Sequence, residues 1–149
     1  MTSRLSPVRL AAALAIAAGF AGVAHADDAT ALAAAAKEPG AVVSASGVVF
    51  KSIKDGTGAS PKASDTVKVN YRGTFPDGKE FDASRGTPIS FQLNRVIPCW
   101  TEGVQRMKIG GKSKLTCPSN LAYGDQGSPP TIPGGATLVF EVELLGIGG

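Results

Sequence analysis

The stretch Val96–Gly124 constrains the fold of this chain most, because it predicts a helix, a strand and an aromatic loop in direct succession. Pro98 stands where the first turn of a helix tolerates proline. Trp100, Val104 and Met107 follow at i, i+4 and i+7, and two glycines end the pattern. The spacing predicts one short amphipathic helix with the only tryptophan of the chain on its inward face.

The residues after this helix predict the elements that pack against it. Ser113–Cys117 is typical of a strand and runs into the loop Pro118–Gly124, which carries Tyr123. Glu102 lies near the positive start of the helix and Arg106 lies four residues later, so the two are expected to pair. Together these elements predict a sheet wrapped around one helix, with an aromatic pocket between them.

The first 26 residues have the pattern of a secretory signal peptide. Arg4 and Arg9 give a positive start, residues 10–23 are apolar or small, and residues 24–26 form a small-x-small cleavage site. We therefore expect cleavage after Ala26 and export. A membrane anchor is the alternative, although the apolar run is shorter than the ~20 residues that a span needs.

Cleavage would leave a nearly neutral domain. Loss of Arg4 and Arg9 from the 15 basic residues leaves 13 against 12 acidic ones, so the net charge of +3 does not indicate nucleic acid. The only histidine, His25, would also leave, which excludes Ser-His-Asp, Cys-His and ordinary His-containing metal sites. No metal, cofactor or nucleic-acid partner is expected.

The two cysteines, Cys99 and Cys117, are an even number in a chain that is expected to reach an oxidising compartment. We expect one disulfide that fastens the start of the helix to the end of the following strand. A redox pair is the alternative, although the usual Cys-x-x-Cys spacing is absent.

The rest of the chain predicts a leader followed by short strands. Residues 27–46 are rich in Ala and lack a docking pattern, so we expect a flexible leader and a domain that spans residues 47–149. A helical turn or two around Ala29–Lys37 stays open. A turn is predicted at Pro76-Asp77-Gly78. The result is an α+β domain with a mostly antiparallel sheet. Apolar runs or alternation predict strands over residues 48–53, 67–72, 89–93, 113–117 and 138–144.

Reactive side chains are scattered, with one exception. Asp82 follows Phe81 in an irregular stretch from which it could turn toward Tyr71, on the apolar face of its strand. A structural hydrogen bond and a catalytic role both stay open for this carboxylate. The large aromatic side chains come from separate segments, so a lined cavity is at least as reasonable as an ordinary core. They are Tyr71, Phe81, Phe91, Trp100, Tyr123 and Phe140.

Four segments share the order and spacing of one family: VKVNYRGTFPDGKEFDAS, VIPCWTEGVQRMKIGGKSKL, LAYGDQG and IPGGATLVFEVELL. Over residues 47–145 the chain thereby resembles the FKBP-type peptidyl-prolyl cis-trans isomerases. The resemblance implies a five- to six-stranded antiparallel half-barrel around one short helix, with a hydrophobic pocket for proline. It is similar to the exported forms of Gram-negative bacteria, which implies the periplasm.

The resemblance also implies roles for single residues. Trp100 would be the pocket floor, and Ile97, on the rim beside Val96, would offer its backbone N–H to a substrate carbonyl. Asp82 and Tyr123 would be the polar groups. The implied catalytic residues are Asp82, Tyr123, Phe140, Tyr71 and Trp100. The implied substrate-binding residues are Phe81, Phe91, Val96, Ile97, Ile132 and Ile89, with Ile132 closing the proline-rich loop over the pocket.

The chain departs from the family pattern at the pocket edge. Ile89 stands where the best-known members have phenylalanine, Ser128 replaces a loop histidine, and Thr131 replaces an apolar loop residue. The segment 82–91 is also shorter, which leaves open whether Arg85 supplies the arginine that partners the pocket aspartate. These departures bear on substrate preference and macrolide affinity, and they leave the pocket floor intact.

The implied reaction needs no nucleophile. Rotation about an Xaa-Pro bond is slow because amide resonance must be broken, and a dry aromatic pocket favours the less polar, twisted amide. The expected partners are proline-containing polypeptides and macrolide inhibitors such as rapamycin. A monomer is expected, with no membrane contact after cleavage. The alternative is a chaperone or proline-binding module that uses the same pocket without turnover.

Overall fold

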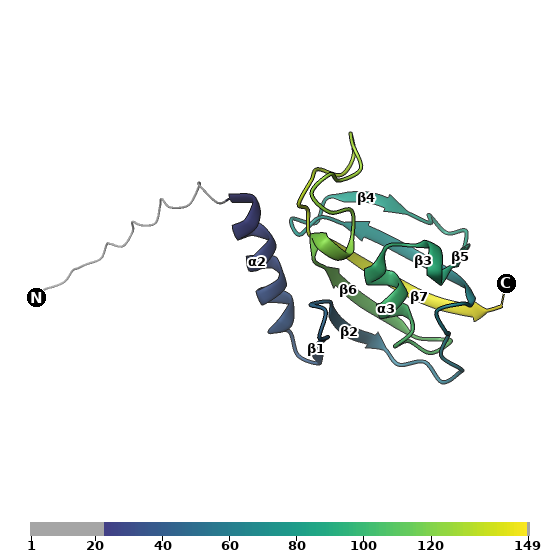
Figure 1. Cartoon of the computed structure of the whole chain (residues 1–149). Helices are drawn as coiled ribbons and strands as arrows, with labels where there is room; N and C mark the ends of the chain where they lie inside the picture. Colours follow the sequence, from purple (N-terminus) through teal and green to yellow (C-terminus); the bar gives the residue numbers. More distant parts are fainter. Residues whose placement is uncertain (1–22, 149) are drawn as a thin grey trace, which may run out of the picture.

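A computed structural model describes residues 23–148, in which seven strands form one antiparallel sheet. The sheet order is β1-β2-β6-β7-β3-β4, with β5 also paired to β3, and the sheet curves around the short helix α3 (Figure 1). The strands are β1 (Ala41–Val43), β2 (Val49–Lys54), β3 (Thr66–Thr74), β4 (Glu80–Ala83), β5 (Ile89–Gln92), β6 (Lys112–Cys117) and β7 (Leu138–Ile147). The helices are α2 (Val23–Ala36) and α3 (Pro98–Val104), with 3-10 turns η2 (Leu93–Arg95) and η3 (Ser119–Leu121).

The predicted α+β fold is confirmed, and so are the five strands that were predicted from apolar patterning. The strands β1 and β4 are additional, since β1 has only three residues and a bulge interrupts the alternation of β4. Every pair of neighbouring strands is antiparallel, and β3 and β7 form the centre of the sheet through their long shared register. The turn at residues 76–78 joins β3 to β4 as predicted, with Gly78 at a φ of 94°.

Alternation along the strands gives the sheet an apolar inner face, toward α3, and a polar outer face. On β7 the side chains of Leu138, Val142 and Leu144 are fully buried, while Glu141 and Glu143 between them are only partly buried. The same alternation places Lys112 and Lys114 of β6 outward. Burial of the inner side chains against α3 supplies the main driving force for folding.

Helix α3 is fastened to β6 at two points. A disulfide joins Cys99 to Cys117 with their Cα atoms 5.7 Å apart, which confirms the expected link between helix and strand. Gly103 faces Leu115, and a Cβ atom added there would lie 2.8 Å from Leu115 Cδ2, so only glycine permits this close approach. Trp100 is 4% exposed and faces inward as predicted.

Helix α3 is shorter than its apolar pattern suggests. It ends at Val104, and Met107 is buried from the turn that follows rather than from the helix itself. Glu102 and Arg106 form no ion pair in the described part of the chain: Arg106 lies beyond the end of α3, and the Glu102 carboxylate accepts a hydrogen bond from the Ser46 hydroxyl instead. The competing partner comes from a distant segment, which local spacing cannot reveal.

The structure differs from the flexible leader that was expected over residues 27–46. This segment contains most of α2 and the strand β1, which extends the sheet beside β2. Lys51 and Lys114 are directly opposed on β2 and β6, and the carboxylate of Glu38 lies 3.1 Å from Lys51 Nζ and 2.6 Å from Lys114 Nζ. Opposed like charges destabilise a strand pair, so Glu38 holds the segment onto the sheet.

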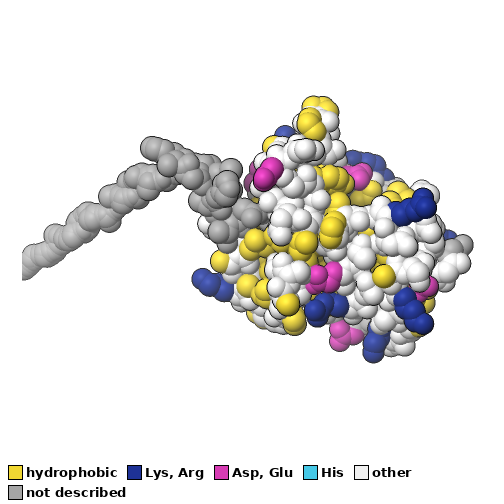
Figure 2. Space-filling model, viewed as in Figure 1, with side chains coloured by type: hydrophobic (Ala, Val, Ile, Leu, Met, Phe, Trp, Pro, Cys, Tyr) yellow, Lys and Arg dark blue, Asp and Glu magenta, His cyan; other side chains and the backbone are white. Residues whose placement is uncertain are grey.

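The predicted signal peptide lies outside the described residues, apart from residues 23–26. Those residues begin α2, which therefore runs across the expected cleavage point after Ala26. Among residues 23–148, no helix has the length and apolar character needed to cross a membrane, and no group of metal-ligating side chains comes together. On the face shown in Figure 2, Lys and Arg side chains are dispersed rather than gathered into one stripe.

Candidate active site

A cavity of about 440 Å³ opens on the inner face of the sheet, above α3. Its lining comes from six segments of the chain: β3, β4, β5, residues 95–100 at the start of α3, the loop after β6, and β7. Most of the residues that the sequence assigned to the site meet here. The lining residues are Tyr71, Asp82, Phe91, Arg95, Val96, Ile97, Trp100, Tyr123 and Phe140.

Trp100 forms the floor of this cavity. Its ring is approached edge-on by three aromatic rings, with centroid distances of 5.3 Å to Tyr71, 5.5 Å to Phe91 and 5.4 Å to Phe140. Edge-to-face packing of this kind is favourable beyond simple burial, and it fixes the orientation of all four rings. The floor is therefore rigid and apolar, and wide enough for a small ring.

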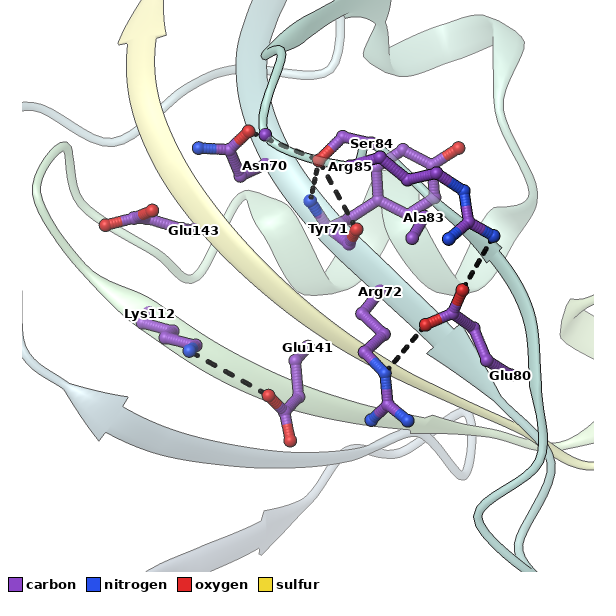
Figure 3. Close-up of a pocket in the computed structure, with 11 residues that line it drawn as sticks. Asn70, Tyr71, Arg72, Glu80, Ala83, Ser84, Arg85, Lys112, Glu141 and Glu143 are labelled. Carbon is purple, nitrogen blue, oxygen red and sulfur yellow. Dashed lines mark hydrogen bonds and ion pairs between the residues drawn. The ribbon is translucent and has the colours of Figure 1, made fainter.

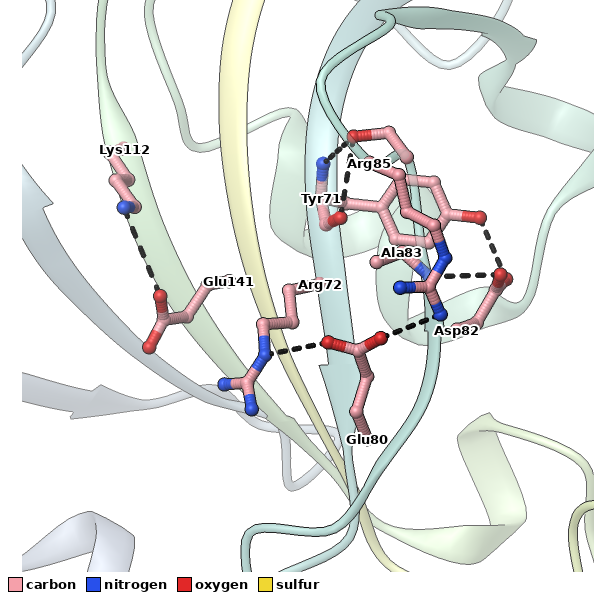
Figure 4. Close-up of polar contacts among 9 residues, drawn as sticks. Tyr71, Arg72, Glu80, Asp82, Ala83, Arg85, Lys112 and Glu141 are labelled. Carbon is pink, nitrogen blue, oxygen red and sulfur yellow. Dashed lines mark hydrogen bonds and ion pairs between the residues drawn. The ribbon is translucent and has the colours of Figure 1, made fainter.

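One polar pair stands at the side of the cavity. The Tyr71 hydroxyl donates a hydrogen bond of 2.7 Å to Asp82 Oδ2, and Asp82 Oδ1 accepts the backbone N–H of Ala83 at 2.9 Å (Figure 4). Burial, and then this hydrogen bond to Asp82, raises the pKa of Tyr71 far above its ordinary value. The phenol therefore stays protonated and keeps Asp82 in place across the physiological pH range.

A bulge in β4 explains why Asp82 reaches the cavity. Thr74 pairs with Glu80, and Gly73 pairs with Asp82, so Phe81 is the extra residue between them. Without a bulge, Glu80 and Asp82 would lie on one face of the sheet, since they are two residues apart. The bulge sends Asp82 inward to Tyr71 and Glu80 outward.

Polar donors at the cavity are left without partners among the described residues. The Trp100 Nε1–H is buried and makes no hydrogen bond. The backbone N–H of Ile97 and the Tyr123 hydroxyl appear in none of the hydrogen bonds of residues 23–148, although the Ile97 carbonyl caps α3. Polar donors that lack a partner are suited to donate hydrogen bonds to the carbonyl oxygens of a ligand.

Three residues that were assigned to the site do not line the cavity. Phe81 lies behind it and packs edge-on against Phe140 at 5.6 Å, above Gly73, where a Cβ atom would lie 2.7 Å from the Phe81 ring. Ile132 is buried in the core, in a loop closed by reciprocal backbone hydrogen bonds with Ser128. Ile89 is 37% exposed at the far end of β5 from Trp100.

The sequence analysis missed Arg95, which lines the cavity from the end of η2. Its position directly before Val96 and Ile97, both assigned to the rim, was the available signal. A single exposed arginine adds nothing to an apolar pattern, so periodicity did not single it out.

The outer face of β3 and β4 carries a second hollow, of about 360 Å³, with a different character (Figure 3). Glu80 accepts from Arg72 Nε at 3.0 Å and pairs with Arg85 at 2.7 Å. The hydrogen bond from Arg72 and the charge of Arg85 hold the pKa of Glu80 below its ordinary value. This settles the open question of Arg85: its partner is Glu80 rather than the pocket residue Asp82.

Comparison with known proteins agrees with this geometry. The FKBP-type peptidyl-prolyl cis-trans isomerase family matches residues 58–145. The chain belongs to this family. It is 55% identical over 114 residues to the FKBP-type peptidyl-prolyl cis-trans isomerase FkpA of Escherichia coli K12, and 47% identical to the FKBP-type 22 kDa isomerase of that organism.

Solved structures of the family share the fold of this chain. The crystal structure of FkpA from Escherichia coli superposes with a TM-score of 0.81 at 50% identity, over 86% of this chain and 61% of that one. A peptidyl-prolyl cis-trans isomerase from Pseudomonas syringae gives 0.82 at 36% identity, over 89% of this chain and 99% of that one. The match covers 75% of this chain but only 42% of the E. coli K12 FkpA sequence, so the chain spans less than half of that relative.

Proposed function

We propose that this chain is a peptidyl-prolyl cis-trans isomerase that accelerates Xaa-Pro isomerisation in exported proteins as they fold. The observation that carries this proposal is the aromatic cavity over Trp100, whose lining includes two donors, the Ile97 N–H and the Tyr123 hydroxyl, that make no hydrogen bond among residues 23–148. Membership of the family supports it. The cavity offers an apolar seat for a proline ring and donors for the carbonyls beside it.

The residues can act without any covalent step. In this mechanism Trp100, Phe140 and Tyr71 hold the proline ring, while the Ile97 N–H and the Tyr123 hydroxyl bind the flanking carbonyls. The amide loses polarity as it twists out of plane, so exclusion of water by the rings favours the transition state over the planar ground state. Each tenfold acceleration requires a decrease of about 1.4 kcal/mol in the barrier of ~18–20 kcal/mol.

Asp82 has a supporting role in this mechanism. Its carboxylate is held by the Tyr71 hydroxyl and by the Ala83 N–H, so its negative charge stays fixed at the side of the cavity. A charge that is already fixed in place sets the electrostatic field at the twisting amide, and no group has to reorient during the reaction. Phe91 and Val96 form further apolar walls of the site, and Phe81 supports Phe140 from behind.

The experiment that tests the proposal is isomerisation of a short Xaa-Pro peptide by the whole chain, with and without rapamycin. We expect acceleration that rapamycin inhibits, and an Asp82→Val variant that folds but turns over peptide more slowly. A folded protein that binds rapamycin and does not accelerate isomerisation would instead support a non-catalytic binding module or chaperone.

We further propose that the protein works in the periplasm as a monomer. The signal-like sequence at residues 1–26 and the Cys99–Cys117 disulfide both suit an oxidising compartment outside the cytoplasm. Fractionation of cells that express the whole chain, followed by N-terminal sequencing, tests export and cleavage after Ala26. Sedimentation of the purified protein tests the oligomeric state.

A further inference from the structure

The cavity rim carries one basic side chain, Arg95, that the proposed mechanism does not use. Arg95 ends η2 directly before Val96, and its side chain is exposed while it lines the cavity. Within residues 23–148, no carboxylate lies within ion-pair distance of its guanidinium. The rim therefore carries a positive charge that the described part of the chain does not neutralise.

The carboxylates of the cavity lining and of the following helix already accept hydrogen bonds from other groups. Asp82, the acidic residue of the cavity lining, uses both oxygens to accept from Tyr71 and Ala83. Glu102, at the other end of the rim segment, accepts from Ser46. Both carboxylates are therefore held in place, and Arg95 is available to a charge that arrives with the substrate.

We propose that Arg95 makes the site selective for substrates with Asp or Glu beside the proline. This inference rests on the proposed isomerase function. Arg95 stands two residues before Ile97, and two residues of extended chain span at most about 7 Å. A substrate whose carbonyl binds the Ile97 N–H therefore presents its flanking side chain within reach of Arg95, whose planar guanidinium binds carboxylates in two-point geometry.

The size of the preference follows from the exposure of the pair. Exposed ion pairs contribute modestly, so we expect an acidic flanking residue to raise kcat/KM about two- to fivefold over its neutral amide analogue. The preference should fade in ~1 M salt, where the screening length falls to ~3 Å. It should also be absent for peptides whose acidic residue is moved several positions away.

The test compares matched peptides that differ only in Glu or Gln, placed directly before or directly after the proline. With the whole chain at low salt we expect the Glu peptide to be preferred in one of these two positions. Arg95→Gln should abolish the preference and Arg95→Glu should reverse it. Because the readout is a ratio of two peptides, a general loss of activity in a variant does not disturb it.

A matched control separates a local contact from net charge. Lys68 is an exposed residue on the outer face of β3, so Lys68→Glu makes the same charge change away from the cavity. We expect the wild-type preference to survive in Lys68→Glu. The proposal would be overturned if Arg95→Glu and Lys68→Glu changed the Glu-to-Gln ratio equally, or if the wild type showed no preference for Glu. In either case, turnover of the Gln peptides would still support the isomerase function. If neither peptide is turned over, the isomerase function fails, and the ratio of the two peptide affinities then tests Arg95 alone.

Discussion

The two faces of the central sheet hold their polar groups in different ways. On the inner face Tyr71 packs against the rings of Phe91 and Trp100 and donates to Asp82, and burial raises the pKa of the phenol. On the outer face Glu80 lies between two exposed arginines, with Arg85 72% exposed, and its pKa is lowered. On the inner face burial has the largest effect on the pKa, whereas on the outer face the pKa is set mainly by ion pairs that water screens. Changes to the inner face should therefore cost far more stability and activity than changes to the outer face.

Phe140→Ala is expected to have the largest effect. Phe140 is 5% exposed and packs on both Trp100 and Phe81, so truncation opens a cavity and removes one wall of the site. We expect a loss of about 3–5 kcal/mol in the free energy of unfolding, together with most of the isomerase activity. Urea unfolding and peptide turnover measure the two effects.

The control is the neighbouring residue on the same strand. Val139 points to the outer face, and Val139→Ala should cost less than half as much as Phe140→Ala while activity is retained. If Phe140→Ala does not fold, Phe140→Leu keeps the comparison, because it fills the core but removes the ring. Equal losses for Val139→Ala and Phe140→Leu would contradict the distinction between the faces.

Removal of the disulfide should rank second. The bridge joins α3 to β6 over a sequence separation of 18, and both cysteines are fully buried. In the chain-entropy model its loss in a Cys99→Ala, Cys117→Ala variant costs about 3 kcal/mol. Chemical denaturation should show this loss, and the wild type under reducing conditions should approach the same stability. Activity in the folded variant should persist, because the packing of Trp100 against its three rings does not depend on the bridge. A variant as stable as the wild type would contradict this prediction.

Much of the inner face could be predicted from the sequence because its signals are local. Alternation identified five strands, and the i, i+4 spacing of Trp100 and Val104 identified α3. The aromatic residues that meet over Trp100 could be named because each lies on an apolar face or in a loop beside one. Local periodicity is the strongest signal that a single sequence carries.

The features that could not be predicted depend on register and on long-range charge. The bulge at Phe81 changes the faces of Glu80 and Asp82 without changing the alternation in the sequence. Glu38 contacts Lys114, which is 76 residues away in the sequence, so no local pattern predicts the attachment of the N-terminal segment. Ile89 fell outside the cavity because β5 carries Phe91, not Ile89, to the end that faces Trp100.

Glu80→Gln tests whether an ion pair on the outer face affects catalysis on the inner face. The Glu80 carboxylate joins β4 to β3 through Arg72 and pairs with Arg85, which has a φ of 55° and lies three residues after Asp82 (Figure 4). We expect kcat/KM to fall, by no more than about fivefold, because an exposed ion pair is weak. High salt should reduce the difference between the variant and the wild type.

The matched control for this bridge is the ion pair of Lys112 with Glu141, which lies on the same outer face but joins β6 to β7. Lys112→Gln should leave turnover unchanged, since neither strand carries Asp82. A similar loss of turnover in Lys112→Gln would show that the effect is a general one of surface charge.

Glu38→Gln should have the smallest effect, and its dependence on pH identifies it. Hydrogen bonds from Lys114, and then from Lys51, lower the pKa of Glu38 below 4.5. A carboxylate whose pKa is lowered by folding adds stability above its unfolded pKa and loses it as the pH falls through the folded value. The free energy of unfolding of the wild type should therefore exceed that of Glu38→Gln by about 0.2–1 kcal/mol at pH 7, and the difference should shrink as the pH falls below the ordinary pKa of Glu.

A double-mutant cycle tests whether this stability difference arises from the contact between Glu38 and Lys114. With Lys114→Gln already in place, the opposed lysines no longer repel each other, and one of the two partners of Glu38 is missing. Glu38→Gln should then cost less at pH 7 than it does in the wild-type background. If the cost is the same in both backgrounds, the carboxylate stabilises the chain by another route. The N-terminal segment would then be held to the sheet by the pairing of β1, which is only three residues long, and by the burial of Ala35 of α2.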